Sequence, residues 1–405
     1  MNKISIFMKN FNKYQLAAIG LIIIGIIIRL ININQPLLEF FPPRQTQTAE
    51  ITRNIYINGW PDFWTPKVRY LTGSPVQFVV EFPLYNGIVA LAYRLLGPNI
   101  ILGRLVSLAF FILSSITFYK ILVSRSSPAS HQSLIILSLI FYVFSPLHIL
   151  TSRSFQPEEI AFFLLLLAIQ KSSWVFFSLA VLTKLPTILF APVLFYQLYR
   201  GGTAFRRIII GFSASLMAPI EWFLRAKALA DHPELIRNAQ ISNWFQPQLW
   251  LQPGWYFSLF QIEHIWVLTT LGLLFFWLGL FKIIASLRGV PIKSGRRGNP
   301  VFWIIWLTSG LLYLAIFNYH AMTLEYYHLF LLPPLSIFVG LGLNQILEIT
   351  RGFSKNIRTL SVAGILILFF LGLVQPAIKK IISVPKSPEE SQEITTDRYR
   401  LIEDF

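Results

Sequence analysis

The chain contains no cysteine and few charged residues. Without Cys among its 405 residues it forms no disulfide and offers no thiolate as a nucleophile or metal ligand. Asp, Glu, Lys and Arg make up only 13% of the chain, whereas 55% is hydrophobic; an ordinary soluble domain is roughly a quarter charged. These proportions exclude a soluble globular protein, and they also exclude coiled-coil, collagen-like and disordered chains.

Long apolar runs take the place of the missing charge. The first, about 16 to 33, follows Lys3, Lys9 and Lys13 and has no convincing small-residue cleavage site after it, so we interpret it as an uncleaved first span. We therefore predict an all-α polytopic membrane protein with about eleven transmembrane helices. The further spans are expected near 102–122, 134–150, 159–170, 172–184, 186–199, 207–223, 264–285, 301–318, 328–347 and 359–376.

The positive charges predict the orientation of these spans. The chain has 34 Lys and Arg against 18 Asp and Glu. If each span crosses once from a cytoplasmic N-terminus, the cytoplasmic segments hold 17 basic residues and a single acid, Glu348, as the positive-inside rule requires. The basic cluster at Arg288, Lys293, Arg296 and Arg297 is explained by this orientation and by anionic lipid, so we expect no nucleic-acid partner.

The long loops, 34–101 and 224–263, then lie on the outer face, and function is expected there. Residues 84–95 have a helical apolar period and residues 49–56 a weaker one, which predicts amphipathic helices lying along the membrane surface. We expect one transmembrane domain over 1–376, followed by a polar tail over 377–405.

Several short motifs on the outer side resemble one family. They are Arg44 to Asn54 (RQTQTAEITRN), Glu81 to Tyr85 (EFPLY), Leu102 to Leu105 (LGRL), Ser145-Pro146 with Ser152 to Glu159 (SRSFQPEE), and Thr183 to Pro186 (TKLP). Their order and spacing resemble the membrane glycosyltransferases of the C-type fold that use polyprenyl-phosphate sugars, which include protein mannosyltransferases and the lipid A aminoarabinose transferase. The resemblance covers roughly the first 200 residues well and the remainder only through its span pattern.

This resemblance implies an enzyme that moves a hexose or pentose from a polyprenyl-phosphate donor to a lipid, glycan or protein acceptor. It implies a site on the outer (periplasmic) face of a bacterial plasma (inner) membrane, in the cell envelope. The sequence has no Gly-rich nucleotide-binding strand and helix, which favours a lipid-linked donor over a nucleotide sugar. A multi-span secondary transporter or lipid flippase is the main alternative, and an O-antigen-ligase-like enzyme is a third.

Transfer through an oxocarbenium-like state needs a carboxylate to deprotonate the acceptor and positive charge for the departing phosphate. Family members commonly carry an acid, the presumed base, where this chain has Arg44-Gln45. We therefore predict Glu39 or Glu158 as the catalytic base, while a degenerate member without catalysis is a third possibility. The predicted phosphate-binding cations are Arg44, Arg53, Arg153 and Lys184.

Other outer residues are weaker candidates. Glu81 is a possible ligand for a divalent metal ion, which would act as a cofactor. Possible substrate contacts are Gln45, His320, Tyr327 and His328, although aromatic and histidine side chains are also common at the bilayer surface. We predict that Glu39, Glu81, Glu158, Arg44 and Arg153 face one outer cavity that is open to the bilayer.

Overall fold

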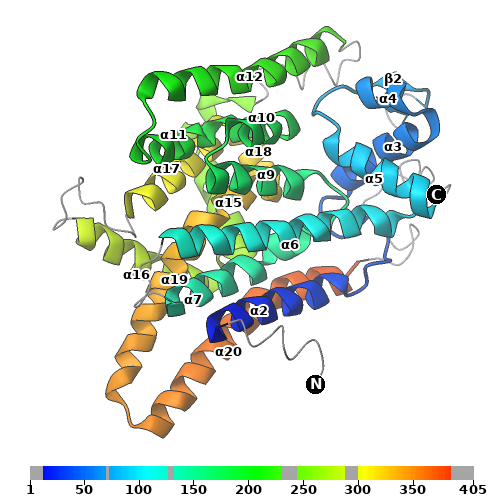
Figure 1. Ribbon diagram of the computed structural model, residues 1–405. Helices are drawn as coiled ribbons and strands as arrows, with labels where there is room; N and C mark the ends of the chain where they lie inside the picture. Colours follow the sequence, from blue (N-terminus) through cyan, green and yellow to red (C-terminus); the bar gives the residue numbers. More distant parts are fainter. Residues whose placement is uncertain (1–11, 70–72, 126–131, 230–243, 288–299, 385–405) are drawn as a thin grey trace, which may run out of the picture.

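The computed structural model describes residues 12–69, 73–125, 132–229, 244–287 and 300–384, and nearly all of these residues are helical (Figure 1). Within them the only sheet is a hairpin of two short antiparallel strands, β1 (Lys67–Val68) and β2 (Val76–Gln77), with Lys67 opposite Gln77. The all-α prediction is confirmed.

The first half of the chain forms α2 (Lys13–Leu30), α3 (Pro42–Asn58), α4 (Trp60–Trp64), α5 (Leu84–Leu96), α6 (Ile100–Arg125), α7 (Gln132–Phe144), α8 (Pro146–Thr151), α9 (Glu158–Lys171), α10 (Trp174–Thr183) and η1 (Leu185–Phe190). The second half forms α11 (Ala191–Arg200), α12 (Phe205–Ala228), η2 (Pro247–Leu251), α15 (Pro253–Ile262), η3 (Glu263–Val267), α16 (Thr269–Leu287), α17 (Pro300–Ile316), α18 (Asn318–Thr323), η4 (Glu325–Leu331), α19 (Leu332–Ile349), η5 (Thr350–Gly352) and α20 (Lys355–Ile382).

A helix occupies every predicted span, but the count of eleven crossings is not confirmed. Among the described residues, five helices are long and apolar enough to cross a membrane, or six if one bent pair counts as a span. Several predicted spans are shorter apolar helices, such as α10 and α17. The last helix, α20, continues to Ile382, past the boundary predicted at 376.

Proline and a left-handed residue explain two of the breaks. The predicted span 134–150 is divided at Ser145, because Pro146 has no amide hydrogen for the α7 ladder and instead begins α8. Residues 253–267 and α16 meet at an angle of 104°, and Thr269 at their junction has a positive φ of 59°. A β-branched residue rarely adopts that conformation. The unusual backbone at Thr269 therefore coincides with the sharp bend between the two helices.

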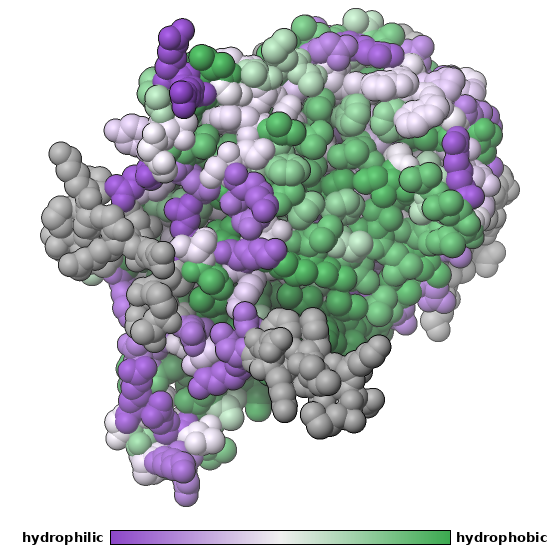
Figure 2. Space-filling view, viewed as in Figure 1, coloured by the Kyte–Doolittle hydropathy of each residue, from purple (hydrophilic) through white to green (hydrophobic). Residues whose placement is uncertain are grey.

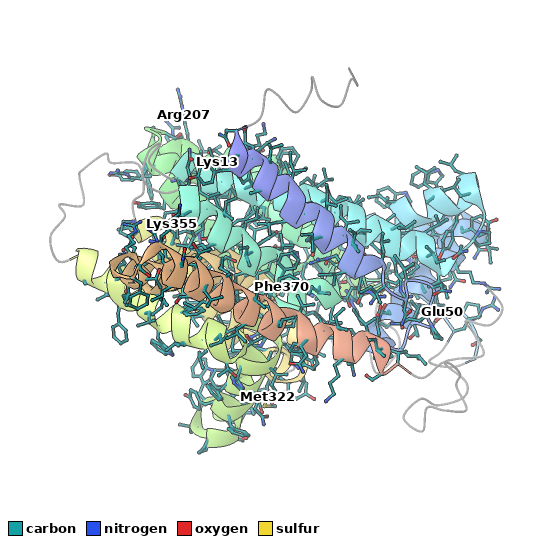
Figure 3. The ribbon with its side chains drawn as sticks, turned by 90° about the horizontal axis from the view of Figure 1, so that it is seen from below. Lys13, Glu50, Arg207, Met322, Lys355 and Phe370 are labelled. Atoms are coloured by element: carbon teal, nitrogen blue, oxygen red, sulfur yellow. The ribbon has the colours of Figure 1, made fainter. Side chains whose placement is uncertain are left out.

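The helices run between two chemically different ends. At one end Arg125 donates to Gln197 (2.6 Å), and Gln197 bonds Ser172 (2.6 Å), which brings together the C-terminal ends of α6, α11 and α9. Arg153 reaches the carbonyl of Ile31 at the other end, beside α3, α4 and α5. In Figure 3, Lys13, Arg207 and Lys355 lie toward one side of the molecule and Glu50 toward the opposite side.

A broad apolar surface lies between these ends. Figure 2 shows it across the middle of one face, with hydrophilic residues on either side of it. Exposed Ile27 on α2 and Leu113 on α6 belong to the apolar surface of the bundle, as expected for side chains that meet lipid. Inside, α16 and α19 pack at backbone contact, because a Cβ at Gly279 or Gly342 would collide with the main chain of the opposite helix.

Candidate functional site

The first site residue, Arg44, is placed by the chain reversal between α2 and α3. Phe41 takes a left-handed conformation (φ 49°), and Pro42 and Pro43 then begin α3. Proline suits the first helical turn, because its fixed φ is helical and its missing N–H would have no partner there. Arg44 therefore leaves the first turn of α3 toward the segment 78–83 that precedes α5.

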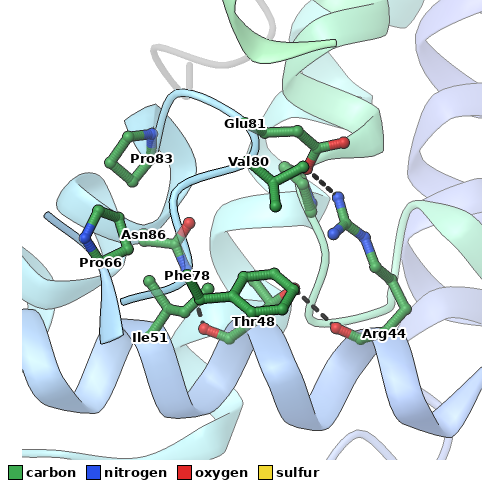
Figure 4. Close-up of a pocket in the computed structure, with 10 residues that line it drawn as sticks. Arg44, Thr48, Ile51, Pro66, Phe78, Val80, Glu81, Pro83 and Asn86 are labelled. Atoms are coloured by element: carbon green, nitrogen blue, oxygen red, sulfur yellow. Dashed lines mark hydrogen bonds and ion pairs between the residues drawn. The ribbon is translucent and has the colours of Figure 1, made fainter. Parts of the chain in front are cut away.

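Arg44 lies between two carboxylates. Its guanidinium pairs with Glu81 and lies 3.3 Å from Oε1 of Glu158, which begins α9. Lys184, at the end of α10, donates to the same oxygen of Glu158 at 2.9 Å. We call Arg44, Glu81, Glu158 and Lys184 the pocket cluster; Figure 4 shows Arg44 reaching Glu81.

Charge pairing determines the ionisation of this cluster. Burial would raise the pKa of Glu158, but Lys184 and Arg44 outweigh it and hold this pKa below its ordinary value of 4.5. Burial would lower the pKa of Arg44, but Glu81 and Glu158 hold it well above its usual range. Glu158 also lies in the first turn of α9, where the helix dipole favours a negative charge. Both groups are therefore charged at neutral pH.

A pocket opens beside the cluster (Figure 4). Its polar lining comes from Arg44, Glu81, Thr48 and Asn86. The amide of Asn86 donates to the carbonyl of Thr48 (2.8 Å), which ties α5 to α3 beneath the pocket. The remaining lining is apolar or proline: Ile51, Pro66, Phe78, Val80, Pro83 and Pro157. The pocket thus offers one guanidinium and one carboxylate in a wall of mixed polar and apolar character.

Aromatic rings cover the other side of Lys184. Its ammonium lies 4.7 Å from the centroid of Tyr326 and 4.6 Å from that of Tyr327, close enough for cation–π attraction. His320 stacks on Tyr327, with ring centroids 5.4 Å apart. Burial lowers the pKa of His320 to about 4, with a smaller contribution from the charge of Lys184, so this ring is neutral at pH 7. Tyr327 and His320 therefore join the cluster through Lys184.

The structure places Glu39 and Arg153 in a second cluster. Glu39 is completely buried between Arg104 (3.3 Å) and Arg153 (3.4 Å), and it also accepts from Gln35 (2.6 Å). We call Glu39, Arg104 and Arg153 the loop anchor. Its two guanidiniums also donate to five main-chain carbonyls between α2 and α3, those of Ile31, Asn32, Ile33, Gln35 and Pro36. Neither Glu39 nor Arg153 lines the pocket.

Three other predicted residues lie outside the pocket lining. Gln45 is buried, donating to the carbonyl of Phe40 (2.8 Å) and accepting from the amide of Phe155 (2.9 Å). His328 contacts Glu263 (2.7 Å) away from the pocket lining. Arg53 lies farther along α3 and is half-buried, outside the pocket lining.

The surroundings of Glu81 do not fit a metal ion. Its carboxylate is held by a guanidinium, which repels a cation. In the part of the chain that the structure describes, no three His, Asp or Glu side chains converge as a ligand set. We therefore assign no metal ion to Glu81.

A buried polar group inside the bundle was missed by the sequence analysis. Glu159 accepts from Ser114 (2.8 Å) and contacts His148 (3.2 Å), while Arg29 donates to Ser152 (2.5 Å). All are completely buried. Arg29 and Glu159 are ionisable residues inside or beside predicted spans. Such residues usually face the interior of the bundle and bond to a partner there, so this signal could have identified them.

The fold and the charged pocket at one end together define a class: the chain is a multi-pass helical membrane protein with a GT-C fold. Two solved structures that share it are those of ArnT from Cupriavidus metallidurans, an aminoarabinose transferase. The structure bound to undecaprenyl phosphate has a TM-score of 0.57 and the apo structure 0.54; each is 14% identical, over 90% of this chain and 74% of ArnT. No model of a protein family matches this sequence, and neither does any curated protein.

Proposed function

We propose that this protein is a glycosyltransferase that moves a sugar from a polyprenyl-phosphate donor to an acceptor. The main observation is the pocket cluster: two cations, Arg44 and Lys184, lie beside an open pocket at one end of a bundle with the ArnT fold. The related ArnT structure contains undecaprenyl phosphate. A lipid-linked phosphate has one charged group next to an apolar chain, which suits cations at the edge of an apolar surface.

The pocket cluster is suited to bind the phosphate end of the donor. A departing phosphate accumulates negative charge and is stabilised by fixed cations in a site with little water. Arg44 is the cation that lines the pocket, and Lys184 lies behind it, joined through Glu158. Tyr327 lies over the ammonium of Lys184 and His320 stacks on Tyr327, so both are proposed as contacts of the sugar or the acceptor.

The proposed face is the outer, periplasmic side of a bacterial plasma membrane, with a cytoplasmic N-terminus. Supporting this, the end opposite the pocket carries Lys13, Arg125, Lys171 and Arg200 at helix termini. Single-cysteine labelling suits a Cys-free chain. A Cys at Thr46 should react with an impermeant reagent in intact cells and one at Lys171 should not; the reverse result would invert the orientation. The basic cluster at Arg288, Lys293, Arg296 and Arg297 lies outside the described residues.

The function is tested on the full chain in lipid nanodiscs. Labelled polyprenyl-phosphate sugars and labelled nucleotide sugars are supplied separately with a membrane extract as the source of acceptor, and endogenous donor synthesis is blocked. We expect label to pass to acceptor only from the lipid donor. Direct use of a nucleotide sugar would overturn the proposal, as would failure to bind undecaprenyl phosphate.

A transporter or flippase is the second candidate, and the buried group around Arg29, Glu159 and His148 is the observation that favours it. Ionisable residues inside a bundle often mark a translocation path. Here they are fully buried and bonded to neighbouring helices. Proteoliposomes loaded with a fluorescent polyprenyl phosphate distinguish the two functions, because a flippase moves the lipid between leaflets without any acceptor.

A further inference from the structure

Of the three carboxylates that could serve as the base, only Glu81 reaches the pocket. Glu39 is completely buried between two guanidiniums. Glu158 is also completely buried and bonded to Lys184. The side chain of Glu81 is 23% exposed and lines the pocket with Arg44. Glu81 is therefore the one of these three carboxylates whose side chain is partly open to solvent.

The two acids of the pocket cluster depend on Arg44 to different degrees. Glu158 is paired with Lys184 at 2.9 Å as well as with Arg44, so it has a second cation of its own. Within the described residues, Arg44 is the only cation paired with Glu81. If Arg44 turns to another anion, Glu158 is still paired with Lys184, whereas Glu81 becomes a free carboxylate that faces the pocket.

We propose that the phosphate of the donor takes the guanidinium of Arg44 and thereby releases Glu81 to act as the general base. This rests on the proposed glycosyltransferase function and deepens it. A phosphate competes well for Arg44, because guanidinium binds phosphate and carboxylate with the same two-pronged geometry.

In this step one bond to the anomeric carbon forms and one breaks. The acceptor hydroxyl gives its proton to a carboxylate oxygen of Glu81 while its oxygen forms a bond to the anomeric carbon of the sugar. The bond from that carbon to the phosphate oxygen breaks, and its electron pair stays on the polyprenyl phosphate. Arg44 neutralises the added charge on the phosphate. The base is thus uncovered only when a donor is in place, which disfavours proton abstraction in an empty site.

The test separates binding from turnover in the full-length protein in nanodiscs. We expect Glu81→Gln to lose turnover of a polyprenyl-phosphate sugar by roughly 10² to 10⁴. The same variant should bind undecaprenyl phosphate at least as tightly as the wild type, because the competing carboxylate of Glu81 is gone. Glu348→Gln, at an exposed pair with Lys282, is the matched control and should leave both quantities unchanged. Wild-type turnover in Glu81→Gln, or weakened binding, would overturn the proposal.

A second measurement needs no variant. A water-soluble carbodiimide, followed by peptide mass spectrometry, reports which carboxylates of the wild type are accessible and unpaired. Addition of undecaprenyl phosphate should increase modification of Glu81 and leave Glu158 unmodified. Unchanged or reduced modification of Glu81 would contradict its release. If the wild type neither binds undecaprenyl phosphate nor transfers sugar, the proposed function itself fails; normal wild-type activity with an active Glu81→Gln defeats this inference alone.

Discussion

The pocket cluster and the loop anchor have similar ingredients and opposite surroundings. Each combines two cations with carboxylate, and both lie near the same chain reversal between α2 and α3. The cations of the loop anchor are also bonded to five main-chain carbonyls, and its acid is fully buried. Arg44 and Lys184 of the pocket cluster contact side chains, and one edge of the cluster is open. A group that holds backbone fixes a loop, whereas one that holds only side chains can exchange its partner for a ligand.

Breaking the loop anchor should have the largest effect on stability. Arg104→Met removes three hydrogen bonds to carbonyls and leaves Glu39 with one cation in the interior. Loss of one partner of a buried ion pair costs about 3–5 kcal/mol, so we expect a strongly lowered unfolding temperature in detergent. The exposed Arg94→Met is the matched control and should unfold like the wild type. A stable Arg104→Met variant would show that the anchor is not needed for folding.

Glu39→Gln distinguishes an anchor from a base. In the loop anchor the substitution leaves two guanidiniums facing an amide, so we expect a loss of stability of about 1–3 kcal/mol. Turnover per folded molecule should stay within about tenfold of the wild type, because the pocket is untouched. A fall of 10² or more with normal stability would return the base assignment to Glu39, as the sequence analysis predicted alongside Glu158.

The sequence predicted the helical fold well because apolar runs identify helices directly. It also named Arg44, Glu158 and Lys184, which do converge. What it could not supply is the direction of each side chain. Glu158 and Glu159 are neighbours on a helix and point about 100° apart, so one reaches Lys184 and the other His148. The left-handed turn at Phe41, which separates Glu39 from Arg44, has no sequence pattern of its own.

Within the pocket cluster, Lys184→Met should mainly weaken donor binding, because Glu158 then depends on Arg44 alone and competes with the phosphate for its guanidinium. A charge-assisted hydrogen bond contributes about 1.5–3 kcal/mol, which corresponds to roughly tenfold to hundredfold in the Kd of undecaprenyl phosphate. Exposed Lys171→Met, at the opposite end of α9, should leave the Kd unchanged. An unaltered Kd in Lys184→Met would remove Lys184 from the phosphate site.

The stability that Glu158 contributes should depend little on pH above the ordinary pKa of a glutamate side chain. The pKa of Glu158 is lowered in the folded protein, so its pairing stabilises the fold above the unfolded value and is lost as the pH falls through the lower folded value. We expect the difference in unfolding temperature between wild type and Glu158→Gln to stay constant from pH 7 to about 5 and to shrink below it. A difference that already declines between pH 7 and 6 would mean that Glu158 is not held ionised by Lys184 and Arg44.

The two histidine–glutamate contacts have a consequence for how the helices are held together. One ring nitrogen of His148 meets the carbonyl of Tyr142 (2.7 Å), and one of His328 meets that of Ala321 (2.9 Å). A carbonyl only accepts, so that nitrogen carries hydrogen. The other nitrogen of each ring faces a carboxylate oxygen, of Glu159 or Glu263. Each histidine therefore links three elements of the bundle: His148 on α8 joins α7 to α9, and His328 on η4 joins α18 to η3.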